Sequence, residues 1–258
     1  MFVDSHAHID GEEFDADRDE VVARARAAGV SAILNVGTGD PHSGSLERAV
    51  AVAERYKNVF AAVGVHPHDA KLYDDEAERR LLHLTKPGGR VVAWGEIGLD
   101  YHYDHSPRDV QRAVFERHID LAKRLKKPII VHNRESTDDM VAVLAKSGVQ
   151  GILHSYTESL DVARRLVEQG FLISFSGIVT FRNAEPLREV AKALPHDMVL
   201  IETDTPYLAP VPYRGRDNEP AYVIKVAELL ANLWGLPIGE VAAKTTANFE
   251  RVFSVKLP

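Results

Sequence analysis

The sequence contains no cysteine among its 258 residues. This absence excludes disulfides and thiolate metal ligands, so any metal site must be built from histidine and carboxylate side chains. The sequence also lacks an apolar run approaching about 18 residues, and we therefore expect no membrane-spanning helix. Met1 leads directly into residues typical of a strand, without the pattern of a signal peptide. We expect a cytoplasmic protein with no membrane partner.

Positive charge is in deficit. The chain has 31 lysines and arginines against 38 aspartates and glutamates, which gives a net charge of -7. This excess of negative charge argues against a protein that binds long nucleic acid through an extended positively charged surface. A local basic cluster within an acidic protein stays possible. Histidine, in contrast, is plentiful, with 12 residues, and the placement of these histidines carries most of the argument.

Short apolar runs rich in β-branched residues alternate with helical patterns along the whole sequence. The runs predict eight strands, at residues 2–8, 32–37, 60–66, 91–99, 128–132, 151–155, 172–176 and 198–204. A helix is expected after each strand, near 14–28, 43–56, 74–84, 107–125, 136–145, 159–169, 186–193 and 221–234, with one more at 238–253. Eight such units predict an α/β fold of the TIM (β/α)8 barrel type, as a single domain over residues 1–258. An open doubly wound sheet is the alternative, but no Gly-x-Gly-x-x-Gly follows the first strand.

Titratable side chains gather where the predicted strands end. The first strand ends in His6-Ala7-His8, and because strand side chains alternate, Asp4, His6 and His8 share one face. The carboxyl ends of barrel strands form the catalytic face, so residues at the other strand ends should converge there, with the eighth strand beside the first. These residues are His66, His68, Glu96, His132, His154, Glu202 and Asp204.

Histidines and carboxylates in this arrangement predict a metal site. His132 and His154 taken singly would be explained as buried histidines with a backbone hydrogen bond, but together with the His-x-His pair they favour metal ligation. Glu96 lies between glycines that leave room around its carboxylate, and it is the natural bridge for two cations. Asp204 is expected to bind a metal, to act as general base, or both. Glu202 and Asp4 are candidates for holding a ligand histidine in place, although Asp4 could equally be structural.

These motifs resemble the TatD family of metal-dependent deoxyribonucleases, from Phe2 to about Phe253. The resemblance is carried by His6-Ala7-His8, Gly64-Val65-His66-Pro67-His68, Gly95-Glu96-Ile97-Gly98-Leu99-Asp100, Val131-His132, His154-Ser155 and Glu202-Thr203-Asp204-Thr205-Pro206-Tyr207. It implies a TIM barrel that binds two divalent ions. One ion is assigned to His6, His8, Glu96 and Asp204, and the other to Glu96, His132 and His154. The donor types suit magnesium, manganese or zinc, with iron a further possibility from the histidines.

The resemblance also implies a substrate and a reaction. The substrate would be DNA, as short or single-stranded ends trimmed from 3′ to 5′. For the reaction, the residues themselves lead us to expect attack by a metal-activated water, with Asp204 accepting the proton. His66 is expected to contact a phosphate or a metal-bound water, and His68 to serve loop structure. The segment 212–220 would face the substrate, although Asp217 stands where the family carries a basic residue. Because guanidinium groups match phosphate oxygens, the substrate-binding candidates are Arg182, Arg214 and Arg216.

Two other functions remain open. An amidohydrolase or lactonase could act on a small molecule with the same ligands, but barrels of that wider group often bridge their metals with a carboxylated lysine. No lysine lies near the end of the fourth predicted strand. A catalytically silent barrel that binds nucleic acid or protein is disfavoured, because a degenerate site should have lost a ligand. We expect a monomeric enzyme.

Overall fold

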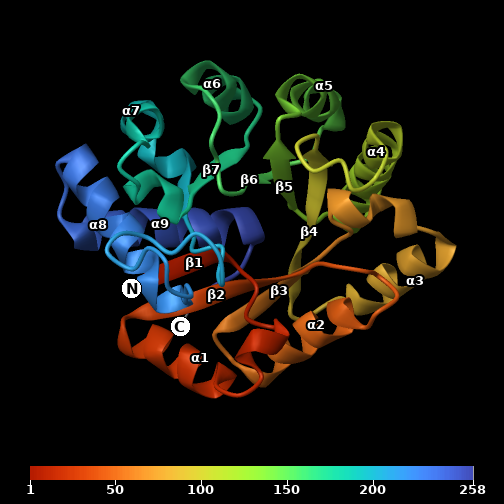
Figure 1. The fold of residues 1–258 in the computed structure, drawn as a ribbon, viewed down its shortest axis with the longest axis horizontal. Coiled ribbons are helices and arrows are strands. Elements are labelled where there is room, and N and C mark those ends of the chain that lie inside the picture. The colour runs from red at the N-terminus through yellow and green to blue at the C-terminus, as the bar shows by residue number, and fades with distance from the viewer. Residues whose placement is uncertain (258) are drawn as a thin grey trace. The chain divides into compact units, whose positions relative to one another are not determined.

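The computed structural model describes residues 1–257, and it alternates strands with helices eight times (Figure 1). The strands are β1 Phe2–Ala7, β2 Val30–Gly37, β3 Val59–Val63, β4 Val91–Asp100, β5 Ile129–Arg134, β6 Gly151–Leu153, β7 Leu172–Phe175 and β8 Val199–Ile201. The helices are α1 Arg18–Ala27, α2 Ser45–Arg55, α3 Asp75–Leu84, α4 Arg108–Leu125, α5 Thr137–Ser147, α6 Leu160–Glu168, α7 Glu185–Ala193, α8 Val223–Trp234 and α9 Ile238–Phe253. The strands follow one another in a sheet in chain order, which confirms the predicted (β/α)8 class.

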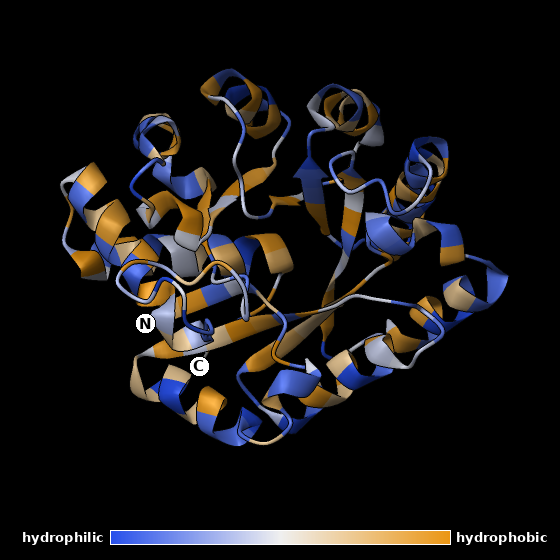
Figure 2. Cartoon of the chain, in the orientation of Figure 1, coloured by the Kyte–Doolittle hydropathy of each residue, from blue (hydrophilic) through white to orange (hydrophobic). Residues whose placement is uncertain are grey.

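The strands and the helices differ in hydropathy. The strands are predominantly hydrophobic, whereas the helices carry both hydrophobic and hydrophilic residues (Figure 2). In β4, all ten residues are buried. This is the pattern of a parallel sheet with both faces covered. Within residues 1–257, no single helix is long and apolar enough to cross a membrane. Two consecutive segments, 220–234 and 238–253, reach the length and hydropathy of a membrane span only when they are counted together, and the chain bends by 111° between them.

Two compact units make up the chain. Unit 1 comprises residues 1–34 and the described residues from His154 onward. In this unit α8 and α9 pack against β1 and β8 (Figure 1), and Phe249 of α9 is fully buried. β1 lies beside the segment that follows β8: the amide of Asp204 donates to the His6 carbonyl at 2.9 Å, and the amide of His8 donates to the Thr205 carbonyl at 2.8 Å. This confirms the prediction that the eighth strand lies beside the first.

Unit 2 comprises residues 35–153, with β3 to β6 and α2 to α5. β4 pairs with β5 in parallel, and Gly98 lies opposite His132. Gly98 has φ +145°, and a Cβ placed on it would lie 2.0 Å from the His132 carbonyl oxygen. The backbones of β4 and β5 therefore approach closely at this point, and only glycine fits this position.

Candidate metal-binding site

In unit 1, three side chains meet where β1 and the segment after β8 run together. The Nε2 atoms of His6 and His8 are 3.1 Å apart. Asp204 Oδ1 lies 3.8 Å from His6 Nε2 and 3.6 Å from His8 Nε2. Ligand atoms held tetrahedrally at about 2.1 Å from one zinc ion are separated by about 3.4 Å, so this group is spaced to chelate a cation. Two main-chain hydrogen bonds, from Asp204 to His6 and from His8 to Thr205, hold these side chains beside one another.

Asp204 occupies a left-handed backbone conformation, with φ +58°. β8 ends at Ile201, so Asp204 lies in a turn after the strand and not on the strand itself. Its carbonyl accepts from the amide of Tyr207 at 2.8 Å. Burial opposes ionisation of its carboxyl, but the hydrogen bond from His8 and the charges of His154 and His6 outweigh burial, and the pKa of Asp204 lies below its usual value. Asp204 is thus held as an anion, the form that a cation requires.

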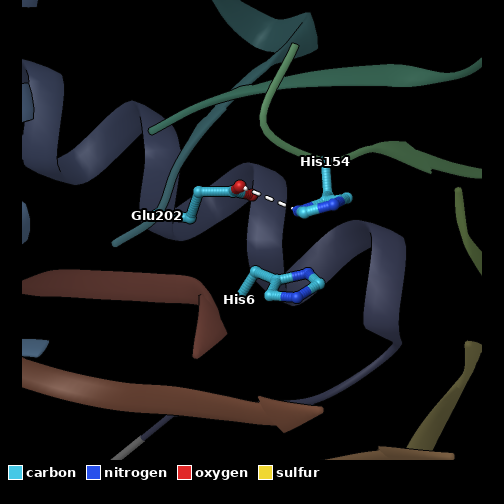
Figure 3. Close-up of side chains that lie close together, drawn as sticks. All are labelled: His6, His154 and Glu202. Carbon is cyan, nitrogen blue, oxygen red and sulfur yellow. Dashed lines mark hydrogen bonds and ion pairs between the residues drawn. The ribbon is translucent and has the colours of Figure 1, made fainter. Parts of the chain in front are cut away.

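His154 and Glu202 lie beside His6 in the same unit (Figure 3). The rings of His6 and His154 stack with centroids 4.0 Å apart. Glu202 Oε1 lies 3.2 Å from His154 Nδ1 and accepts from the amide of Ser155 at 2.7 Å. Glu202 is fully buried, and its Oε2 atom has no hydrogen-bond partner among residues 1–257. A buried, unsatisfied carboxylate oxygen is costly, and a cation would satisfy it.

The groups of His6, His154 and Glu202 lie close enough to hold a metal ion, with their ligand atoms within 4.8 Å of one another. Glu202 was also predicted to hold a ligand histidine in place, and its contact with His154 Nδ1 has the geometry for that role. Because Glu202 engages Nδ1, the imidazole can present its Nε2 atom to a metal. The site therefore offers Glu202 two uses, as ligand or as support for His154.

Asp4 is buried deeper in unit 1, and its carboxyl group accepts mainly from Thr203. Its Oδ1 accepts from the Thr203 amide at 2.9 Å, and its Oδ2 accepts from the Thr203 hydroxyl at 2.6 Å. Burial raises the pKa of Asp4 to about 8, against the effect of these bonds. Asp4 also accepts from the backbone amide of His6 at 3.3 Å. It positions β1 against the segment that carries Asp204, through backbone rather than ring contacts.

Unit 2 holds a second group of metal-binding side chains. Glu96 Oε1 lies 2.9 Å from His132 Nδ1 and 3.6 Å from His66 Nε2. These three residues have ligand atoms within 4.8 Å of one another and could hold an ion. The sequence predicted Glu96 and His132 as ligands, whereas it assigned His66 to substrate. The structure brings His66 to the same carboxylate.

Asp100 is a functional candidate that the sequence argument did not single out. Its Oδ2 atom lies 2.9 Å from His68 Nε2 and 3.2 Å from His132 Nε2. Burial opposes its ionisation, but hydrogen bonds from His132, the Tyr103 backbone and His68 hold the pKa of Asp100 well below its usual range. The signal was available, because Glu96, Gly98 and Asp100 alternate along β4 and share a face. His68, expected to serve loop structure, donates its amide to His66 and also contacts this acid.

The three candidate arginines lie in unit 1 and are all exposed: Arg182, Arg214 and Arg216. None of their side chains makes an ion pair with another residue in the range 1–257. The guanidinium carbon of Arg214 lies 3.8 Å from the centroid of the Phe181 ring. Asn218 in the same loop donates to the carbonyls of Thr203 and Tyr207, which flank Asp204. The loop is therefore tied to the turn that carries Asp204.

Comparison with known proteins gives a consistent result. The family model described as TatD related DNase matches residues 3–254. The chain is 44% identical to the uncharacterized metal-dependent hydrolase YabD of Bacillus subtilis, over 99% of this chain and 100% of that protein. It is 36% identical to the 3'-5' ssDNA/RNA exonuclease TatD of Cronobacter sakazakii, over 95% of each chain. The crystal structure of YJJV, a TatD homolog from Escherichia coli, matches with a TM-score of 0.91 and 30% identity, covering 99% of this chain and 98% of that one.

Proposed function

The chain belongs to the TatD related DNase family and is a metal-dependent hydrolase, and on that premise we propose that it cleaves phosphodiester bonds of DNA. We propose single-stranded 3′ ends as the substrate, since a relative of 36% identity is named a 3'-5' ssDNA/RNA exonuclease. The observation that carries the proposal is the pair of donor groups, His6–His8–Asp204 in unit 1 and His66–Glu96–His132 in unit 2.

Two divalent ions are proposed, one for each donor group. His6, His8 and Asp204 would hold the first, with His154 beside them, and Glu96 and His132 would hold the second. The bridging role of Glu96 and the place of His154 in the second ligand set, both implied by the family resemblance, stay predictions. When bound, divalent ions supply a Lewis acid and lower the pKa of a coordinated water. The donors are nitrogen and oxygen atoms only, which suits magnesium, manganese or zinc.

Side chains of this protein would accept the proton and bind the substrate. Asp204 would accept a proton from the attacking water, and the three histidines that hold its carboxyl ionised support this role. Arg182, Arg214 and Arg216 are exposed cations that could bind phosphate oxygens. With a net charge of -7, the chain is expected to bind short or terminal segments rather than long duplexes.

A nuclease assay tests the proposal. Single-stranded DNA labelled at its 5′ end would be incubated with protein that was chelated and then refilled with magnesium, manganese or zinc. We expect a ladder of products shortened from the 3′ end with at least one metal and none in chelator. Asp204→Asn should reduce the rate by a factor of about 100 or more, whereas Asp161→Asn, an exposed residue of α6, serves as the matched control.

Two results would count against the proposal. Activity that persists in metal-free protein would reject metal-assisted hydrolysis. Absence of cleavage with every metal, in protein shown to bind the ions, would favour hydrolysis of a small molecule on the same ligands instead.

A further inference from the structure

An exposed aromatic side chain stands beside the donor group of unit 2. Tyr103 lies in the loop between β4 and α4 and is 49% exposed. Among the described residues of unit 2 it is the only large hydrophobic side chain that is exposed. Its hydroxyl group makes no hydrogen bond within residues 1–257. The exposed part of this side chain is therefore open to a ligand.

Tyr103 is held in a layered arrangement of planar groups. The ring of His105 lies parallel to it, with centroids 5.4 Å apart and planes inclined by 8°. The guanidinium carbon of Arg134, at the end of β5, lies 4.7 Å from the Tyr103 ring centroid. His68 and His102 meet the ring edge-to-face. We call Tyr103, His105 and Arg134, which are all exposed, the Tyr103 platform.

The charged side chains around the Tyr103 platform form ion pairs with one another, except for Arg134. Asp104 accepts from Arg108 at 2.8 and 2.7 Å, and Glu135 pairs with His102 at 2.7 Å. Arg134 makes no ion pair with any residue in the range 1–257. Its guanidinium group is instead fixed over the tyrosine ring. An exposed planar stack with one free guanidinium offers what a nucleotide needs, a surface for the base and a partner for the phosphate.

The platform is connected to the candidate metal ligands through His68. The His68 ring contacts both Tyr103 and His105, and its Nε2 atom lies 2.9 Å from Asp100 Oδ2. The same carboxylate oxygen lies 3.2 Å from Nε2 of His132. A base bound on the platform would therefore belong to a strand whose phosphates pass near this donor group.

We propose that the Tyr103 platform stacks one nucleobase of a single-stranded nucleic acid and that Arg134 binds an adjacent phosphate. The inference rests on the proposed function, because it supplies a binding subsite for that substrate. Stacking on an aromatic ring accepts every base, so the platform would give affinity for single strands without choosing a sequence.

Binding of a strand that resists cleavage tests the inference on the full-length, metal-loaded protein. Fluorescein-labelled phosphorothioate dodecathymidylate would be compared by fluorescence anisotropy with the same strand made of abasic units. We expect the wild-type protein to bind the thymine strand at least about tenfold more tightly, from the loss of one stacked base. Tyr103→Ala should bring that ratio close to one, and Tyr103→Phe should retain it.

Arg134→Gln is expected to act differently from the tyrosine variants. It should weaken both strands by a similar factor and reduce the slope of log affinity against log salt by about one. Arg79→Gln, which removes an exposed charge from α3, is the matched control and should leave the slope unchanged. Thermal unfolding would verify each variant, and Tyr103→Leu replaces Tyr103→Ala if the latter does not fold.

The outcomes separate this inference from the nuclease proposal. An equal affinity of the wild-type protein for the two strands, or a full preference for thymine in Tyr103→Ala, would overturn the platform even if DNA is cleaved. Base-dependent binding that Tyr103→Ala abolishes would support the platform even if ordinary DNA were left uncut, a result that would overturn only the nuclease proposal.

Discussion

His118 makes stability depend on pH in a way that can be calculated from the structure. It is fully buried in α4, and its Nδ1 atom accepts from the indole of Trp94 at 2.8 Å. Burial lowers the pKa of His118 to about 3, from an ordinary value of 6.5. Protonation would also turn Nδ1 into a donor facing the donor of Trp94. Trp94 is itself fully buried in β4, two residues before Glu96, so this bond anchors the strand that carries a predicted ligand.

The sign follows from proton binding in the two states. As the pH falls below 6.5 the unfolded chain gains a proton at His118 that the folded chain does not take up, so the free energy of unfolding falls, until the pH reaches about 3. Each pH unit inside this window is worth about 1.4 kcal/mol. Between pH 7 and pH 5 the contribution of His118 should therefore decrease by about 2 kcal/mol.

Urea unfolding of the wild-type protein and of His118→Gln measures this contribution. Glutamine can accept from Trp94 but does not titrate, and any constant cost of the substitution cancels when the two proteins are compared across pH. The difference in unfolding free energy should shrink by about 2 kcal/mol from pH 7 to pH 5. A difference that stays constant, or an NMR titration showing His118 protonated at pH 5, would refute the reasoning.

Two further predictions concern β4 and Glu202. Gly98→Ala should lower the free energy of unfolding by about 3 kcal/mol or more, because its Cβ would overlap the His132 carbonyl at φ +145°. The control is Gly44→Ala, at a position with φ +86° and open space around it. In the same urea experiment this variant should lower the free energy of unfolding by about 1 kcal/mol. Glu202→Gln should weaken metal binding by a factor of about 10 to 100, measured by competition with a chelating dye, because it removes the charge beside His154. An unchanged metal affinity in Glu202→Gln, compared with the exposed control Glu168→Gln, would show that Glu202 neither binds nor supports a ligand.

Most of the fold could be predicted because the strand and helix patterns are strong. The helix expected at residues 238–253 is α9, and the strand expected at 91–99 is β4 with one more residue. The ends of the strands were predicted less well. The eighth strand was expected to run to Asp204, yet it ends at Ile201, because Asp204 turns the chain in a left-handed conformation that periodicity does not reveal.

Sequence reasoning could name candidate ligands that stand near strand ends, such as His6 and His132. It was incomplete where contacts depend on loops and on side-chain rotation. The pairing of His68 with Asp100, and the contacts of Tyr103 with His105 and Arg134, join residues whose positions depend on the loop after β4. A sequence pattern does not fix such loop geometry. The ligand assignments, the single domain, the monomeric state and the cytoplasmic location stay predictions.

Anomalous X-ray diffraction from crystals loaded with manganese or zinc tests the central claim most directly, since it locates each ion independently of any activity. We predict one peak within about 2.5 Å of donor atoms of His6, His8 and Asp204, and another at the same distance from Glu96 and His132. Peaks only at surface carboxylates, or none in either donor group, would contradict the account.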